Sequence, residues 1–401
     1  MKKIIYFSIL SLMFLACNKA NNSNENKKEI NQLPNYSFEK GSLENWVIDG
    51  DSPDVSDLDN IGEHEVPILK DGDYFLDGSE TETFTATSKS ILIEKDMSLS
   101  FKLGGYSSIL YICDAKSGDQ LFKFTNTEYI NSVNGNLKYG HRGYNLNPYY
   151  FDLSSLEGKE INIVLAKEFE GNAYFDDIKF FTTGEIDEKS YVTYPKTEKY
   201  DEGKIYYKKA LDNVLETMIG GFLGSSVTRG VNIPTSFVEH LSTRNPYLTY
   251  EKSAVNGTTL YDSGADSYYQ RLTKMKKHNY DFFVVQLSTN DASKNYPISQ
   301  TETAIRNIVS YIDENFGCPI LFYTNPLYTQ NVYSQMVTML LRIKDELNIN
   351  VLDMYHDEAI NNMSATERSK YMIDAIHPTV LGYQELFTCR FERSILSMVE
   401  A

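Results

Sequence analysis

The sequence predicts two domains of different fold class, an all-β sandwich followed by an α/β domain. The length of 401 residues suits two to three domains of about 150 residues each. Short apolar runs separated by Gly, Asp and Asn fill residues 33–182, whereas strand-like and helix-like segments alternate over residues 204–401. Apolar residues make up 41% and charged residues 23%, as in ordinary globular proteins.

The first domain, residues 33–182, is expected to form a jelly-roll sandwich, because short strands recur at near-regular spacing. The expected strands share alternating or clustered apolar residues and are Ser90–Ile93, Leu99–Leu103, Ser108–Cys113, Ile161–Ala166 and Ala173–Phe181. The segment 183–203 that follows is polar and contains Gly184 and Pro195, which is typical of a linker.

The second domain, residues 204–401, is expected to contain a mostly parallel sheet covered by helices on both faces. The expected strands are Met218–Leu223, Leu248–Val255, Asp281–Leu287, Pro319–Tyr323 and Asn350–Met354. The expected helices are Ser236–Leu241, Tyr268–Lys277, Glu302–Asn315, Val332–Leu347 and Val380–Val399. In such sheets the active site lies at the carboxyl ends of the strands.

The amino terminus carries the features of an export signal. Lys2 and Lys3 precede the apolar run Ile4–Leu15, which is shorter than the about 20 residues that a membrane span needs. The following Leu15-Ala16-Cys17 resembles the lipobox of bacterial lipoproteins, which implies cleavage after residue 16 and acylation of Cys17. The alternative is a plain signal peptide with an incidental cysteine. Residues 17–32 are then a flexible tether, and the protein is an exported, membrane-anchored lipoprotein of the cell envelope.

The charge and the cysteine content argue against a nucleic-acid-binding protein, a disulfide-rich protein and a zinc protein. Lys and Arg number 38 against 55 Asp and Glu, and the resulting charge of −17 argues against a nucleic-acid partner. The cysteines after Cys17 are Cys113, Cys318 and Cys389, an odd and widely spread set that argues against a disulfide framework or a zinc site. They are expected to be buried free thiols.

Two polar motifs have the chemistry of a serine nucleophile and its base. Ser225 and Ser226 follow the first strand of the second domain, where a sharp turn exposes a hydroxyl above the sheet. Asp374 precedes His377 by three residues, a spacing that lets the carboxylate orient the imidazole so that the ring takes a proton from a serine. Either motif alone is weak evidence.

The other histidines are less suitable as a base. His356 precedes two acidic residues and is an alternative base. His240 and His278 are expected at the surface of amphipathic helices. His64 and His141 complete the set of six.

Donors for an oxyanion follow the neighbouring strands. Candidates are the backbone N–H groups of Ser226 and Gly257 and the side-chain amide of Asn290. One such donor is worth about 3–4 kcal/mol of barrier. Gly257 and Asn290 are also residue types that commonly form loops, and this remains the alternative interpretation.

The sequence blocks around Ser226, Gly257, Asn290 and His377 follow one another in this order along the chain. Together they resemble the SGNH hydrolases of the GDSL esterase superfamily over about Met218 to Val399. The resemblance implies a flavodoxin-like α/β/α fold and carboxylic ester hydrolysis, often of acetyl groups on carbohydrate. It implies a triad of Ser226, His377 and Asp374, with Ser226, Gly257 and Asn290 as the oxyanion hole and no cofactor for catalysis. The sequence departs from the family at Ser225, where the family has aspartate, and at Ser288, where it has glycine.

The first domain resembles galactose-binding-like jelly-roll modules through Asn35–Gly41, Leu43–Trp46 and Tyr174–Ile178. In such modules acidic residues near the two ends sometimes hold a structural calcium ion, and here Glu39 and Asp177 are the candidates. Trp46 is expected in the core rather than on a sugar-binding surface.

The sequence therefore predicts a lipid-anchored serine esterase acting on acylated carbohydrate through an acyl-enzyme on Ser226. Two alternatives stay open. One is an acyltransferase on the same fold, in which a sugar hydroxyl replaces water. The other is a glycan-binding lipoprotein that has lost catalysis. The acyl group, the sugar and the membrane face are not determined by the sequence.

Overall fold

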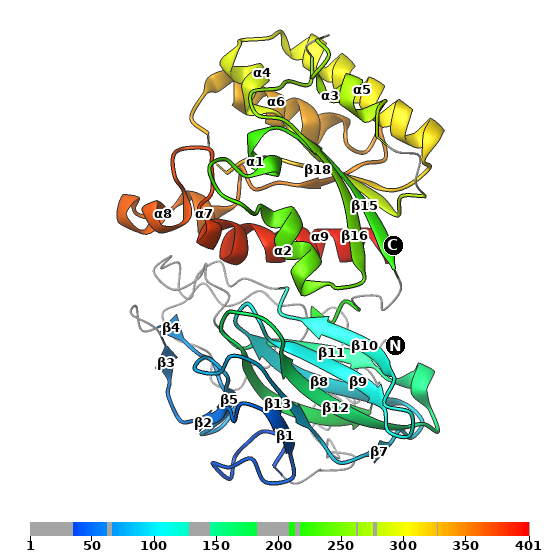
Figure 1. Ribbon diagram of the computed structural model, residues 1–401, viewed down its shortest axis with the longest axis vertical. Helices are drawn as coiled ribbons and strands as arrows, with labels where there is room; N and C mark the ends of the chain where they lie inside the picture. Colours follow the sequence, from blue (N-terminus) through cyan, green and yellow to red (C-terminus); the bar gives the residue numbers. More distant parts are fainter. Residues whose placement is uncertain are drawn as a thin grey trace, which may run out of the picture.

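The computed structural model describes residues 35–61, 66–127, 145–182, 208–212, 217–261, 264–275, 279–326 and 328–400. The predicted signal (1–16), lipidated Cys17, tether (17–32) and linker (183–203) lie outside the described residues, as do His64, His141 and His278. Figure 1 shows a β-domain built from the first part of the chain beside an α/β domain built from the second.

The β-domain contains two sheets whose neighbouring long strands run antiparallel. The first sheet has the order β1 (Val47–Gly50), β6 (Phe84–Thr87), β12 (Glu160–Lys167), β9 (Ile109–Asp114) and β10 (Gln120–Thr125), with β7 (Ile91–Leu92) beside β12. The second has the order β14 (Lys208–Lys209), β11 (Asn147–Asp152), β8 (Met97–Gly104), β13 (Tyr174–Thr182), β5 (Phe75–Asp77) and β2 (Asp54–Ser56). The short strands β3 (Asn60–Ile61) and β4 (Val66–Pro67) pair separately, and Ser154–Leu156 form a 3₁₀ turn.

One hydrophobic core joins the two sheets, as in a β-sandwich. On β12 the side chains of Ile161, Ile163 and Leu165 alternate toward this core, as the period of a strand requires. Trp46 packs inside it against Phe38, with ring centroids 5.7 Å apart, so its predicted core position is confirmed. The five strands expected in this domain are all present, and the jelly-roll connectivity stays a prediction.

The α/β domain is built on a five-stranded parallel sheet. Its order is β16 (Leu248–Ala254), β15 (Met218–Gly224), β17 (Phe282–Gln286), β18 (Ile320–Tyr323) and β19 (Asn350–Leu352). Numbered along the domain, this order is 2-1-3-4-5, the flavodoxin-like arrangement. All five strands match the expected segments.

Helices cover both faces of this sheet, because its strands are apolar on both sides. Phe283 and Val285 of β17 point into one core cluster and Phe282 and Val284 into the other. The helices that contribute most to the first cluster are α3 (Tyr268–Leu272), α5 (Ile298–Asn315) and α6 (Asn331–Ile343). The helices that contribute most to the second are α2 (Phe237–Arg244), the π-helical segment Gly382–Thr388 and α9 (Cys389–Val399). The expected helix Val380–Val399 is present and continuous, and it includes this π-helical segment.

Four short helices were not expected from the sequence. They are α1 (Ser226–Arg229), α4 (Thr289–Ser293), α7 (Glu358–Asn361) and α8 (Ala365–Tyr371). Within the described ranges, no helix combines the length and apolar character that crossing a membrane requires. Cys113 and Cys389 are buried free thiols, as expected, whereas Cys318 is only partly buried.

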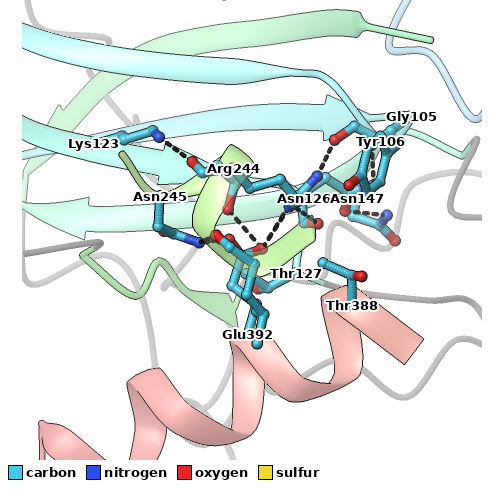
Figure 2. Close-up of polar contacts among 12 residues, drawn as sticks. Gly105, Tyr106, Lys123, Asn126, Thr127, Asn147, Arg244, Asn245, Thr388 and Glu392 are labelled. Atoms are coloured by element: carbon cyan, nitrogen blue, oxygen red, sulfur yellow. Dashed lines mark hydrogen bonds and ion pairs between the residues drawn. The ribbon is translucent and has the colours of Figure 1, made fainter. Parts of the chain in front are cut away.

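The two domains meet at a buried ion pair, shown in Figure 2. Arg244 at the end of α2 donates from Nε and Nη2 to Oε2 of Glu392 on α9, at 3.1 and 2.6 Å. The same guanidinium donates to the carbonyl groups of Tyr106 and Asn126 in the β-domain. The Arg244 and Glu392 side chains are 0% and 1% exposed, so neither charge is solvated by water.

Further polar groups complete this interface. Lys123 of β10 donates to the Arg244 carbonyl, and Thr125 donates to Glu392 at 3.0 Å. Asn245 donates to the second carboxylate oxygen of Glu392 at 2.7 Å. Because buried polar groups are costly unless paired, this network favours one fixed arrangement of the two domains.

Candidate active site

The turn after β15 presents two adjacent serines at the carboxyl end of the sheet. The strand ends at Gly224, and α1 begins at Ser226. A side chain at Gly224 would overlap that of Thr228, so only glycine fits this tight turn.

Gln286 at the end of β17 distinguishes the two serines. Its Oε1 accepts hydrogen bonds from the Ser225 backbone at 2.9 Å and from the Ser225 hydroxyl at 3.2 Å. The Thr228 hydroxyl donates to the same oxygen at 3.0 Å. Ser225 is therefore turned into the protein and fully buried, while Ser226 remains 8% exposed.

The structure brings Ser226, His377 and Asp374 into one hydrogen-bonded chain. Nε2 of His377 lies 2.9 Å from Oγ of Ser226, across 151 residues of sequence. Nδ1 of His377 lies 2.8 Å from Oδ2 of Asp374. With the Nδ1 proton directed at the carboxylate, Nε2 is left to accept the proton of the serine hydroxyl.

Asp374 is held as a carboxylate by its own loop. Its Oδ1 accepts the backbone N–H groups of Ile376 and His377 at 2.7 and 2.8 Å. Partial burial raises the pKa of Asp374, but the hydrogen bonds from His377 and from these two N–H groups outweigh burial and lower it overall. The group therefore stays ionised at neutral pH.

The three candidate oxyanion donors follow the carboxyl ends of three neighbouring strands, with Ser226 after β15, Gly257 after β16 and Asn290 after β17. Gly257 follows β16 and has φ of 74°, in the left-handed region that favours glycine. Asn290 is in α4, after β17, and donates one amide hydrogen to the Thr258 carbonyl at 3.0 Å. The amide carries a second hydrogen, which that bond does not use. Asn290 is thus joined to the Gly257 loop.

Arg271 of α3 ties the Gly257 loop to the serine turn. The side chain is buried, and its Nη2 donates to the Gly224 carbonyl at 2.8 Å and to the Thr258 hydroxyl at 3.1 Å. Its Nη1 donates to the Ser253 carbonyl at the end of β16. One guanidinium therefore fixes the spacing between the turn that carries Ser226 and the loop that carries Gly257.

The Arg271→Met substitution is expected to lower kcat by about 10- to 100-fold, because small misplacements of reacting groups cost this much. KM for a small ester should change little, since the buried Arg271 guanidinium is bonded to protein groups. Steady-state kinetics on ethyl acetate checks this, with Arg306→Met as the control because Arg306 forms exposed ion pairs on α5. Arg271→Lys should restore part of kcat. An unchanged kcat in Arg271→Met would contradict the role.

The two other histidines that the structure describes, His356 and His240, lie elsewhere. Nδ1 of His356 lies 2.7 Å from Asp353 Oδ2, and its side chain is 60% exposed. No hydrogen bond joins it to Ser225 or Ser226 in the described structure. The expected surface position of His240 is wrong: the residue is buried and its ring packs edge-on against Tyr106 of the β-domain. The domain interface covers that face of α2.

The two candidate calcium ligands, Glu39 and Asp177, both interact with other groups of the protein. Glu39 accepts the backbone N–H groups of Asp73 and Tyr74, and buried Asp177 contacts the Lys179 ammonium. Burial raises the pKa of Asp177 to about 6 despite the nearby lysines. Among the described residues, no group of three or more His, Cys, Asp or Glu side chains is placed to hold a metal ion. Calcium needs oxygen ligands, and the Asp177 carboxylate is already paired with the positively charged Lys179 ammonium group, so Asp177 does not fit a calcium site.

Comparison with known proteins finds a family match within the α/β domain. Residues 222–385 match the model of the GDSL-like Lipase/Acylhydrolase family. No curated protein sequence matches the chain.

Several solved structures are similar to the chain. A protein from Lactobacillus plantarum is 16% identical, with 46% of this chain and 98% of that one covered and a TM-score of 0.41. A member of the lipolytic protein G-D-S-L family from Veillonella parvula is 14% identical, with 44% and 97% covered and a TM-score of 0.37. A family two carbohydrate esterase from Clostridium thermocellum, in complex with cellohexaose, is 14% identical, with 81% and 95% covered and a TM-score of 0.37.

Proposed function

We propose that this chain, whose C-terminal domain is a GDSL-like lipase/acylhydrolase domain of the SGNH esterase type, removes acetyl or other short acyl groups from carbohydrate. The observation that carries the proposal is the hydrogen-bonded chain from Ser226 through His377 to Asp374. These three groups have the chemistry that nucleophilic acyl transfer requires.

In this mechanism Oγ of Ser226 attacks the acyl carbonyl while His377 takes the hydroxyl proton. Asp374 stabilises the imidazolium that forms. The backbone N–H groups of Ser226 and Gly257 and the free amide hydrogen of Asn290 stabilise the oxyanion, each worth about 3–4 kcal/mol. His377 then protonates the leaving alcohol, and water releases the acyl group from Ser226 by the same steps in reverse.

The carbohydrate substrate and the cellular site are parts of the same proposal. Support for a short acyl ester of a sugar comes from the resemblance to a family that often cleaves such esters. Acylation of Cys17 would hold the enzyme on the membrane of the cell envelope, where exported enzymes meet glycans. The donors named above act without a cofactor or metal ion.

The experiment uses residues 18–401, which retain every described residue, with an acetylated xylo-oligosaccharide and free cellobiose as acceptor. Acetate release that matches the loss of sugar ester supports a hydrolase. Acetyl transfer to cellobiose as the main product would contradict hydrolysis and favour the acyltransferase. If the protein binds the glycan but removes no acetyl group from it, the result would contradict an enzymatic function and favour the glycan-binding lipoprotein.

A further inference from the structure

Two tyrosines lie on the loops that flank the serine turn. Tyr261 follows β16 and Tyr296 follows α4, which comes after β17. In the sheet, β16 and β17 lie on either side of β15, the strand that leads to Ser226. Both loops leave the carboxyl ends of their strands, so both tyrosines lie at the edge of the sheet that carries the serine.

A single buried residue, Asp291, holds both tyrosine backbones, one through its carboxylate and the other through its main-chain carbonyl. Oδ1 of Asp291 accepts the N–H of Tyr261 at 3.0 Å, and Oδ2 accepts the N–H of Leu260 at 2.8 Å. The carbonyl of Asp291 accepts the N–H of Tyr296 at 3.1 Å. Asp291 is fully buried and directly follows Asn290, so the pair is fixed relative to the proposed oxyanion hole.

The rings of this pair contact each other at the surface. Their centroids are 5.1 Å apart and their planes are inclined by 74°. Tyr261 is 39% exposed, and Lys294 lies 5.7 Å from the centroid of the Tyr296 ring. Neither ring is part of the two apolar core clusters formed by the described residues of this domain. Core packing therefore does not account for the pair.

We propose that Tyr261 and Tyr296 form a stacking platform for the sugar ring that bears the ester, a role that rests on the proposed function. A pyranose ring has an apolar face of C–H groups and hydroxyls at its edge. A tyrosine offers the matching surface, an apolar ring with a polar tip, and loses little conformational entropy when it is already held in place. The platform positions the sugar while Ser226 attacks its acyl group.

The test compares Tyr261→Ala and Tyr296→Ala on two substrates, the acetylated xylo-oligosaccharide and ethyl acetate. Ethyl acetate has no sugar ring that could stack on the platform. For the oligosaccharide, KM is expected to rise about 5- to 10-fold in each variant, as for the loss of an aromatic contact. Kinetics on ethyl acetate should be unchanged, and Tyr261→Phe should behave as the unmodified protein because it keeps the ring.

Tyr250→Ala is the matched control, because Tyr250 is a similarly exposed tyrosine within β16 rather than on the loop after it. An equal loss on both esters would overturn the platform, since it would mean that the tyrosines only shape the oxyanion loops. Unchanged kinetics on both esters would also overturn it. If the unmodified protein cleaves neither ester, the proposed function fails and the platform with it.

Discussion

Replacing Ser226 with alanine is expected to lower kcat/KM for ethyl acetate by about 10⁴- to 10⁶-fold. The variant lacks the serine hydroxyl that is bonded to His377, so no acyl-enzyme forms. Oxyanion donors and substrate binding remain, and these account for any residual rate above that in water. Initial rates by pH titration measure the effect.

Ser225→Ala is the matched control. It removes the hydrogen bond from the Ser225 hydroxyl to Gln286, which contributes about 1 kcal/mol to stability, so most of the activity should remain. Circular dichroism should show that both variants are folded. Loss of activity in Ser225→Ala with activity retained in Ser226→Ala would contradict the assignment of the nucleophile.

The second large effect concerns the stability of the whole chain. Arg244→Met is expected to lower the free energy of unfolding by about 3–5 kcal/mol, because it leaves the buried Glu392 carboxylate without the arginine that neutralises its charge. Denaturant unfolding of residues 18–401 measures this value. Arg342→Met, which breaks an exposed ion pair, should cost at most about 1 kcal/mol.

The double variant Arg244→Met with Glu392→Leu separates the lost pair from the stranded charge. Replacing both buried charges by apolar groups is expected to recover most of the loss. A double variant less stable than Arg244→Met alone would contradict the stranded carboxylate as the cause of the loss.

The same ion pair predicts how stability depends on pH. Burial raises the pKa of Glu392, but Arg244 and the hydrogen bonds to the carboxylate lower it overall, below the ordinary value of 4.5. A group whose pKa is lower in the folded chain contributes stability above its unfolded pKa. The contribution of Glu392 is therefore complete above about pH 5 and is lost as the pH falls through its folded pKa.

Much of the fold could be predicted because apolar periodicity is local. Every segment expected to be a strand contains one, but the β-domain also has strands that were not expected, among them β6, β10 and β11. The long helices α5 and α6 begin within a few residues of expectation. Helices α1 and α4 have four and five residues, too short to show a helical period. His240 looked exposed because its helix was considered without the β-domain that covers it.

The candidate site, too, has residues that the sequence identifies and residues that it does not. The motifs around Ser226 and His377 are local and identify the groups that the structure joins. Gln286 and Arg271 were missed, because their partners are 61 and 47 residues away and nothing near them in sequence marks those contacts. A glutamine ending the otherwise apolar run of β17 was the available signal.

The most direct test of the central claim is covalent labelling of the chain by diethyl p-nitrophenyl phosphate. This reagent leaves a diethylphosphoryl group on an activated serine, and mass spectrometry of the digested protein locates it. We expect one label, on Oγ of Ser226, formed in step with the loss of esterase activity and greatly slowed in His377→Ala. A label on Ser225, or complete inactivation with Ser226 unmodified, would contradict Ser226 as the nucleophile.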